Sequence, residues 1–280
     1  MKKGLLALSA ATLFVMTTPV QAKQEICVYD LLGRAGESYK LIEEWKLAAK
    51  NWQGDIELIP YQDEKKAEQD FDAGKCDGVY MTSMRARKYN KFAGSIDAAG
   101  AFTSNAIAQK AISFVLDNRN KHRLTASVGG EKYEVAGIIQ VGLAYIFVRD
   151  KNIDTIEKAK GKKFAYLHYD QAQKTIVESI DLIAVPSDIS NFVKKFNSGQ
   201  VDVIAAPAYA YKPLEISKGM ANGALFNFPV VNITGDLIIK PGKFPTNFGT
   251  QSRQWFINKL PSNFANIQRL EAGMDAKKIT

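Results

Sequence analysis

DFDAGKCDGVYMTS, at residues 70–83, is partly repeated at residues 195–208 as KFNSGQVDVIAAPA. Alignment of the two stretches superimposes a phenylalanine, a glycine and an aspartate, which pair as Phe71 with Phe196, Gly74 with Gly199, and Asp77 with Asp202. Each stretch is typical of the end of a helix, a glycine that closes it and the start of a buried strand. One copy occurs in many α/β proteins, but the repetition indicates two similar structural units.

The residues around the first stretch alternate short β-rich runs with amphipathic segments. Residues 38–52, for example, carry apolar side chains at helical spacing, namely Leu41, Trp45, Ala48 and Trp52. The alternation predicts strands at residues 25–32, 55–61 and 76–81 and helices at residues 38–52 and 63–73. This order is typical of a parallel sheet with covering helices.

The residues around the second stretch follow the same order. Strands are predicted at residues 164–167, 181–186 and 201–207, and helices at residues 171–180 and 187–198. The second of these helices carries apolar residues at one-turn spacing, namely Ile189, Phe192, Val193 and Phe196. We therefore expect two lobes, each with a small sheet of its own.

Two longer apolar runs, at residues 133–150 and 228–240, predict strands that cross from one lobe to the other. Two helices are expected at residues 250–260 and 262–274, packed back on the first lobe. These boundaries assign residues 23–138 and 236–280 to lobe 1 and residues 139–235 to lobe 2. Ligands of open α/β sheets bind beyond the carboxyl ends of the strands, so we expect a ligand cleft between the lobes that closes by a hinge motion.

The first 22 residues are typical of a secretory signal peptide. Two lysines precede an apolar run from Leu5 to Met16, and Val20-Gln21-Ala22 resembles a cleavage site. We expect cleavage after Ala22, and no lipid-anchor cysteine follows that position. No later segment is apolar enough to span a bilayer. The sequence therefore predicts export to the periplasm.

Composition and motifs argue against several classes of function. Loss of residues 1–22 removes two lysines and no acid, which lowers the net charge from +8 to +6. The lysines are scattered rather than gathered in a basic stripe, which argues against nucleic-acid binding. The sequence lacks the common nucleophile, zinc-protease and phosphate-binding motifs and shows no ligand-spaced metal cluster. We therefore expect neither an enzyme nor a bound metal or cofactor.

The chain has two cysteines, Cys27 and Cys76. In an exported protein a disulfide is the default expectation. Closure of a loop of about 50 residues contributes roughly 4 kcal/mol in the chain-entropy model. Two buried thiols remain the alternative.

Several segments resemble a family of solute-binding proteins distantly related to the extracytoplasmic receptors of TRAP transporters. They read, in chain order, FDAGKCDGVYMTSMRARKYNKFAGSIDAAGA, YEVAGI, YIFVRDKNIDT, GKKFAYLHYDQAQ, VPSDISNFVKKFNSGQVD and APAYAYKPLE. The resemblance implies an α/β, two-lobed type II periplasmic-binding-protein fold. It also implies a monomeric receptor that captures a small-molecule solute by hinge closure and delivers it to the subunits of a membrane transporter.

One position departs from the receptors that the chain resembles. Those receptors often carry an arginine in the strand after an LKG turn of the second lobe, where it pairs with a substrate carboxylate. The matching stretch here is AKGKKFAYL, and Ala165 stands at the arginine position. This difference argues against a simple organic-acid ligand, unless Arg85 or Arg87 of the other lobe takes over.

Candidate ligand contacts lie just after the predicted strand ends. They are Asp30, Arg34, Ser83, Arg85 and Arg87 in the first lobe and Tyr169, Asp170, Gln173, Tyr209 and Tyr211 in the second. Ser83 is expected to cap a helix whose amides face the cleft. The alternatives are that the arginines pair with nearby acids, that Asp170 only caps its helix, and that the tyrosines pack within the second lobe.

Two other functions stay open at this point. Some members of the resembled family are labelled efflux-pump or aminoglycoside-resistance proteins, which suggests an accessory protein of an efflux or envelope complex. A periplasmic enzyme built on the same scaffold is the weaker alternative, because a fold does not determine a function. Ligand binding, a co-purifying partner or turnover would distinguish the three.

Overall fold

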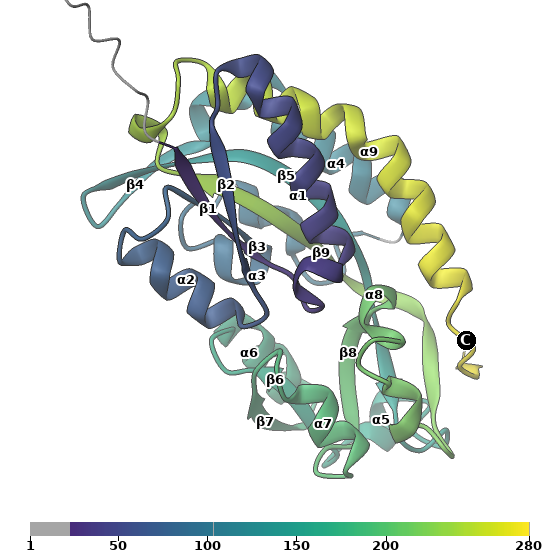
Figure 1. Cartoon of the computed structure of the whole chain (residues 1–280). Helices are drawn as coiled ribbons and strands as arrows, with labels where there is room; N and C mark the ends of the chain where they lie inside the picture. The colour runs from purple at the N-terminus through teal and green to yellow at the C-terminus, as the bar shows by residue number, and fades with distance from the viewer. Residues whose placement is uncertain (1–22, 103, 280) are drawn as a thin grey trace, which may run out of the picture.

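The computed structural model describes residues 23–102 and 104–279 and shows two lobes, one above the other in Figure 1. The predicted signal peptide lies outside the described residues. The predicted alternation is confirmed in both lobes. In lobe 1 it gives β1 (Gln24–Tyr29), α1 (Glu37–Ala49), β2 (Ile56–Tyr61), α2 (Glu64–Asp72) and β3 (Gly78–Thr82); in lobe 2 it gives β6 (Lys163–Leu167), α6 (Gln171–Ser179), β7 (Ile183–Ser187), α7 (Phe192–Asn197) and β8 (Val203–Pro207).

The two lobes share one sheet, in the order β2-β1-β3-β9-β5-β8-β6-β7. The long strands β5 (Glu131–Val148) and β9 (Ala224–Ile239) run between the lobes and pair antiparallel with each other, so the expected crossing strands are confirmed. The expectation of two separate sheets was wrong, because this pairing joins them. The order is symmetric: β1 and β6 each lie between two parallel neighbours, and β3 and β8 each pair antiparallel with a long strand.

The long strands bend where they pass between the lobes. Their pairing register shifts at four places between Val135 and Phe147. Such bulges let a strand bend and twist. Gly142, at one of them, has φ of 147°, which a residue with a side chain rarely adopts.

The remaining helices pack around the sheet, and two short strands extend it, β4 (Thr125–Val128) beside β5 and β10 (Lys278–Ile279) beside β9. The C-terminal region forms one helix, α9 (Phe248–Ala272), with Pro261 inside it, where two helices were expected. Trp45 of α1 donates a hydrogen bond to Ser252, and Tyr145 of β5 donates one to Glu271 near the other end of α9. The shorter helical elements are α3 (Ser83–Ala86), the 3-10 turn η3 (Ala93–Asp97), α4 (Asn105–Leu116), α5 (Ile156–Ala159) and α8 (Ala208–Tyr211).

The buried apolar side chains form separate clusters in the two lobes. Trp45, Phe71 and Phe256 belong to the cluster of lobe 1, whereas Phe147 and Phe196 belong to a cluster of lobe 2. The boundaries of the lobes at residues 138 and 236 stay a prediction. Within the described ranges, no helix has both the length and the apolar character needed to cross a membrane.

The predicted disulfide between Cys27 and Cys76 is confirmed, with the two Cα atoms 5.9 Å apart. Cys27 lies in β1, and Cys76 precedes β3, which pairs with β1. The bond therefore ties together two neighbouring strands of lobe 1.

Candidate functional site: a cavity between the lobes

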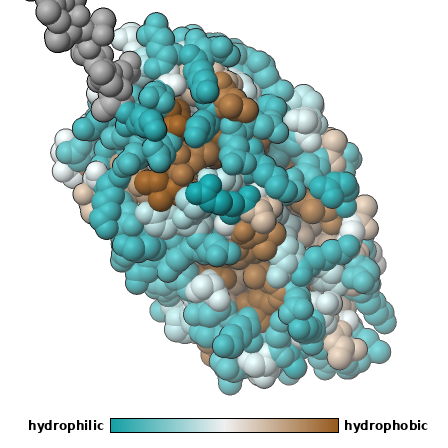
Figure 2. Space-filling view, in the orientation of Figure 1, coloured by the Kyte–Doolittle hydropathy of each residue, from teal (hydrophilic) through white to brown (hydrophobic). Residues whose placement is uncertain are grey.

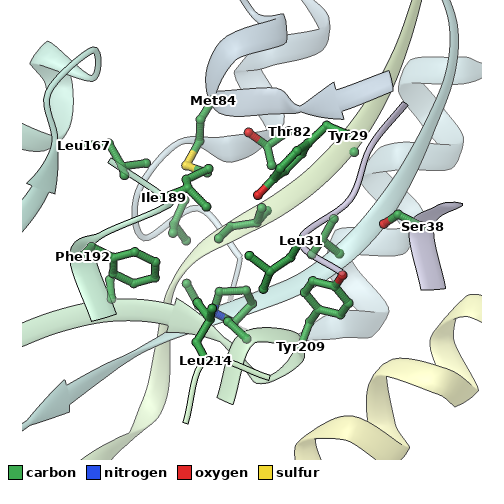
Figure 3. Close-up of a pocket in the computed structure, with 18 of the residues that line it drawn as sticks. Tyr29, Leu31, Ser38, Thr82, Met84, Leu167, Ile189, Phe192, Tyr209 and Leu214 are labelled. Carbon is green, nitrogen blue, oxygen red and sulfur yellow. The ribbon is translucent and has the colours of Figure 1, made fainter. Parts of the chain in front are cut away.

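A cavity of about 110 Å³ lies between the lobes, at the carboxyl ends of β1, β3, β6 and β8. Figure 3 shows apolar side chains from both lobes converging on it. In the orientation of Figure 1, the space-filling view in Figure 2 shows apolar surface in the hollow between the lobes, with polar surface on both sides. The labelled apolar side chains on its wall are Leu31 and Met84 of lobe 1 and Leu167, Ile189, Phe192 and Leu214 of lobe 2.

Asp30 and Tyr209 meet across this cavity. The Tyr209 hydroxyl donates a hydrogen bond of 2.7 Å to Asp30 Oδ1. Asp30 is 2% exposed and also accepts from the backbone amides of Leu32 and Tyr39, at 2.8 and 3.1 Å. Burial, together with the Asp30 carboxylate, raises the pKa of Tyr209 well above its ordinary value. The phenol therefore stays protonated and acts as the donor.

Arg85 is buried among acids of both lobes. Its guanidinium contacts Glu64 at 3.1 Å and Glu68 at 2.8 Å in lobe 1, and Asp188 at 3.5 Å in lobe 2. It also lies 3.8 Å from the centre of the Tyr169 ring, which is a cation–π distance. Arg85 thus has partners in both lobes and is not left free for an anionic ligand.

The N-terminus of the short helix α3 is occupied by a side chain of the protein. Glu64 Oε1 accepts hydrogen bonds from the amide and the hydroxyl of Thr82, at 2.7 and 2.6 Å. Thr82 stands at the N-cap position, and Ser83 is the buried first residue of the helix. The prediction that Ser83 caps this helix was wrong, because the chain enters the helix one residue earlier. Burial raises the pKa of Glu64 to about 7.

Arg87 and Asp170 form a second contact between the lobes. Arg87 Nη2 lies 2.7 Å from Asp170 Oδ2, while Asp170 Oδ1 accepts a hydrogen bond of 3.0 Å from the amide of Gln173. Asp170 is therefore both the N-cap of α6 and an ion-pair partner of lobe 1. The Gln173 side chain in turn accepts a bond of 2.6 Å from the amide of Leu167.

Arg34 and Tyr211 lie away from the cavity. Arg34 lies over the ring of Tyr39, at 5.6 Å from its centre. Tyr211 is buried in lobe 2, where its ring stacks on Phe147 and its hydroxyl donates to Asp275. The structure thus brings Asp30, Gln173 and Tyr209 to the cavity wall and sets Arg85, Arg87, Tyr169 and Asp170 in contacts between the lobes.

Sequence reasoning missed the apolar wall. It searched strand ends for polar groups, whereas Leu31, Met84 and Leu167 follow or end the same strands. Their position just past strand ends was a usable signal. Ala165, at the position of the missing arginine, does line the cavity.

Comparison with known proteins agrees with this architecture. The sequence model of the family described as "Solute-binding protein AdeT 1/2" matches residues 41–279. The chain belongs to this family. The probable solute-binding protein AdeT1 of Acinetobacter baumannii is 37% identical to this AdeT-family protein over 251 residues, which cover 89% of this chain and 81% of that protein.

Solved structures share the fold. A TRAP periplasmic solute-binding protein from Haemophilus influenzae RdAW, with bound L-gulonate, gives a TM-score of 0.71 at 12% identity and covers 91% of this chain and 86% of its own. One from Xanthobacter autotrophicus Py2, with bound β-D-galacturonate, gives 0.70 at 14% identity and covers 92% and 89%. The α/β fold of TRAP periplasmic solute-binding proteins is therefore confirmed for this AdeT-family chain.

Proposed function

We propose that this protein is a periplasmic receptor that encloses a small solute between its lobes and delivers it to a membrane transporter. The observation that carries the proposal is the cavity at the strand ends, whose wall comes from both lobes. A ligand that contacts both lobes stabilises the closed arrangement over an open one. The bulged strands β5 and β9 supply the connection about which the lobes would move.

Opening would break polar contacts that this structure holds between the lobes. The hydrogen bond from Tyr209 to Asp30 and the ion pair of Arg87 with Asp170 both cross from one lobe to the other. Breaking these two contacts costs little free energy, because water hydrates each of the four groups once the lobes separate. The solute's own contacts therefore decide how long the receptor stays closed.

The cavity favours a small and largely apolar solute. No lysine or arginine is among the described residues that line it, and Asp30 is the one charged group among them. An anion such as the sugar acids bound by the structural relatives would meet that carboxylate without a cation to pair with. A volume of about 110 Å³ holds a single ring or a short branched chain.

Native mass spectrometry of the protein purified from periplasm, compared with its denatured mass, tests the proposal. We expect an excess mass that is lost on denaturation and identifies the solute. The matched variant Ala165→Trp fills the cavity and should lose the excess mass while keeping its circular dichroism. A wild-type protein with no excess mass and no thermal shift from single-ring apolar compounds would contradict the proposal, and a co-purifying protein would instead support an accessory role.

A further inference from the structure

A second cavity, of about 420 Å³, lies between α5, α6 and the first half of β9 in lobe 2 and the α3 and η3 region of lobe 1, and shares part of its wall with the central cavity. We propose that it is a separate binding site for an apolar molecule that carries a positively charged amine, with the amine held at Asp97. This site differs from the proposed solute cavity in size and in its polar end, because Asp97 lacks hydrogen-bond partners of the kind that Asp30 has.

The wall of the second cavity is mainly aliphatic and aromatic, and part of it is open to solvent. Ile156, Ile176 and Phe228 line it and are 55%, 47% and 51% exposed. Large apolar side chains gathered at an open cavity are typical of a binding site, because their exposure to water is otherwise unfavourable. The cavity also falls within the range of about 300–1,000 Å³ that small-molecule sites occupy.

The polar end of this cavity carries an acid without a hydrogen-bond partner. Asp97 is 7% exposed, and neither of its carboxylate oxygens has a hydrogen-bond partner of normal geometry. The Ser83 hydroxyl lowers the pKa of Asp97, although Ser83 Oγ and both Asp97 oxygens lack a hydrogen bond of normal geometry. A buried carboxylate in this condition is unfavourable unless a donor from a ligand satisfies it.

The surrounding charges favour a cation at Asp97. The guanidinium of Arg87 lies 3.9 Å from Asp97 and is engaged with Asp170 at 2.7 Å. Both acids and this arginine line the cavity, so its polar end holds two carboxyl groups and one cation. Burial raises the pKa of Asp97 to about 6, so the group is mostly ionised at neutral pH. A positively charged amine bound there would neutralise the remaining negative charge of the two carboxyl groups and the arginine.

Three naphthalene probes test the site: 1-naphthylmethylamine, 1-naphthalenemethanol and 1-naphthoate, which differ mainly in charge. A two-ring molecule is too large for the central cavity of about 110 Å³ but fits the second one. In calorimetric titrations of the wild-type protein at pH 7.5 we expect the amine to bind about tenfold or more tightly than the alcohol, as a hydrogen bond to a charged group predicts, and the carboxylate to bind weakest. This comparison needs no variant. Equal binding of the amine and the alcohol, or no binding of any probe, would overturn the proposal.

Matched variants locate the site. Asp97→Asn should lower the affinity for the amine to that for the alcohol, while Asp181→Asn, at a carboxylate whose side chain is 68% exposed, should change neither. Ala172→Trp, in the second cavity, should weaken binding of all the probes, and Ala165→Trp, in the central cavity, should leave it unchanged. Loss of probe binding in Ala165→Trp would place the probes in the central cavity and overturn this inference. Failure to find a retained solute by native mass spectrometry would bear only on the proposed receptor function.

Discussion

In lobe 1 the Asp77 carboxylate accepts a hydrogen bond of 3.0 Å from the amide of Glu25, and the Asp77 amide donates one of 2.7 Å to the Glu25 carbonyl. In lobe 2 Asp202 forms the same pair of bonds with Lys163, both at 2.8 Å. The repeated aspartate thus joins the start of one parallel strand to its neighbour in each lobe. The repeated stretch therefore marks, in each lobe, the place where this aspartate holds two parallel strands together, which we call the joint.

The helix that precedes each joint ends in the same way. Gly74 and Gly199 have φ of 75° and 78°, and their amides donate to the carbonyls of Phe71 and Phe196. A basic side chain at the end of the long neighbouring strand donates to the same carbonyl. It is Lys240 in lobe 1, at 3.1 Å, and Arg149 in lobe 2.

The lobes differ at the positions of the disulfide. Counting from the matched aspartates and their strand partners, Cys76 corresponds to Val201 and Cys27 to Ala165. Both residues of lobe 2 are buried and apolar. Lobe 1 has a covalent link where lobe 2 has side-chain packing, and Ala165 can then serve as a wall of the cavity. The same backbone arrangement therefore carries a disulfide in lobe 1 and a residue of the cavity wall in lobe 2.

The two phenylalanines of the repeated stretch, Phe71 and Phe196, give the largest expected effect on stability. Phe71→Ala and Phe196→Ala each remove a fully buried ring and should lower the free energy of unfolding by about 3–5 kcal/mol. Phe71→Ala should lie at the upper end, because its ring also contacts Tyr89 and Tyr133. Urea unfolding followed by circular dichroism measures both. A loss below about 1 kcal/mol for one of them would break the equivalence of the lobes.

Removal of the disulfide should affect lobe 1 alone. The double variant Cys27→Ala, Cys76→Ala should lose about 2–4 kcal/mol, because the unfolded chain regains the freedom of the closed loop. Hydrogen exchange should show the loss in amides of β1 and β3, with β6 and β8 protected as in the wild type. Equal loss of protection in both lobes would mean that they unfold as one unit.

The pH dependence of stability should also come from the lobe 1 side. Burial raises the pKa of Asp236, in β9, from 3.8 to about 8, so the folded protein holds a proton that the unfolded chain releases above about pH 4. Stability from this group therefore falls as pH rises from about 4 to about 8. Asp236→Asn should gain about 2 kcal/mol on the wild type between pH 5.5 and pH 7. Parallel stability curves for the two proteins over this range would contradict the assignment.

The repeated glycines should give the smallest effect. Gly74→Ala and Gly199→Ala place a side chain at positive φ and should each cost about 1 kcal/mol. A methyl group at either position meets no atom within 3.4 Å, so the cost is conformational and should be equal in the two lobes. Gly242→Ala is the matched control, because its φ is ordinary and its surroundings are open. Unequal losses at Gly74 and Gly199 would show that one lobe relaxes more easily.

Much of the fold was predictable because its signals are local. Apolar periodicity over a few turns predicted the alternating strands and helices, and the long apolar runs predicted β5 and β9. The pairing of β5 with β9 into one sheet was not predictable, because it depends on contacts between segments about 90 residues apart. The helix that continues through Pro261 was missed because proline usually ends a helix, whereas packing of α9 against α1 and β5 supports it here.

The candidate site was predictable in position but not in character. Asp30 and Tyr209 were found because they follow strand ends, where α/β proteins bind ligands. The sequence could not show that Arg85 meets Asp188, which lies 103 residues further along the chain. The charges that marked a polar site are therefore engaged with one another, and apolar side chains form most of the cavity wall.

The amino-acid sequence by itself determined the two matched α/β units and the candidate cysteine pair, because periodicity, glycine caps and residue type act over short stretches of chain. The hydrogen bonds that Asp77 and Asp202 make at the joints connect residues 52 and 39 positions apart and depend on the tertiary fold. Only the tertiary structure decided which charges neutralise each other, that Ala165 faces a cavity, and that Asp97 is buried without a hydrogen-bond partner. Those properties depend on how two lobes are placed against each other, and electrostatic and packing energies vary with that distance on the scale of a few ångströms.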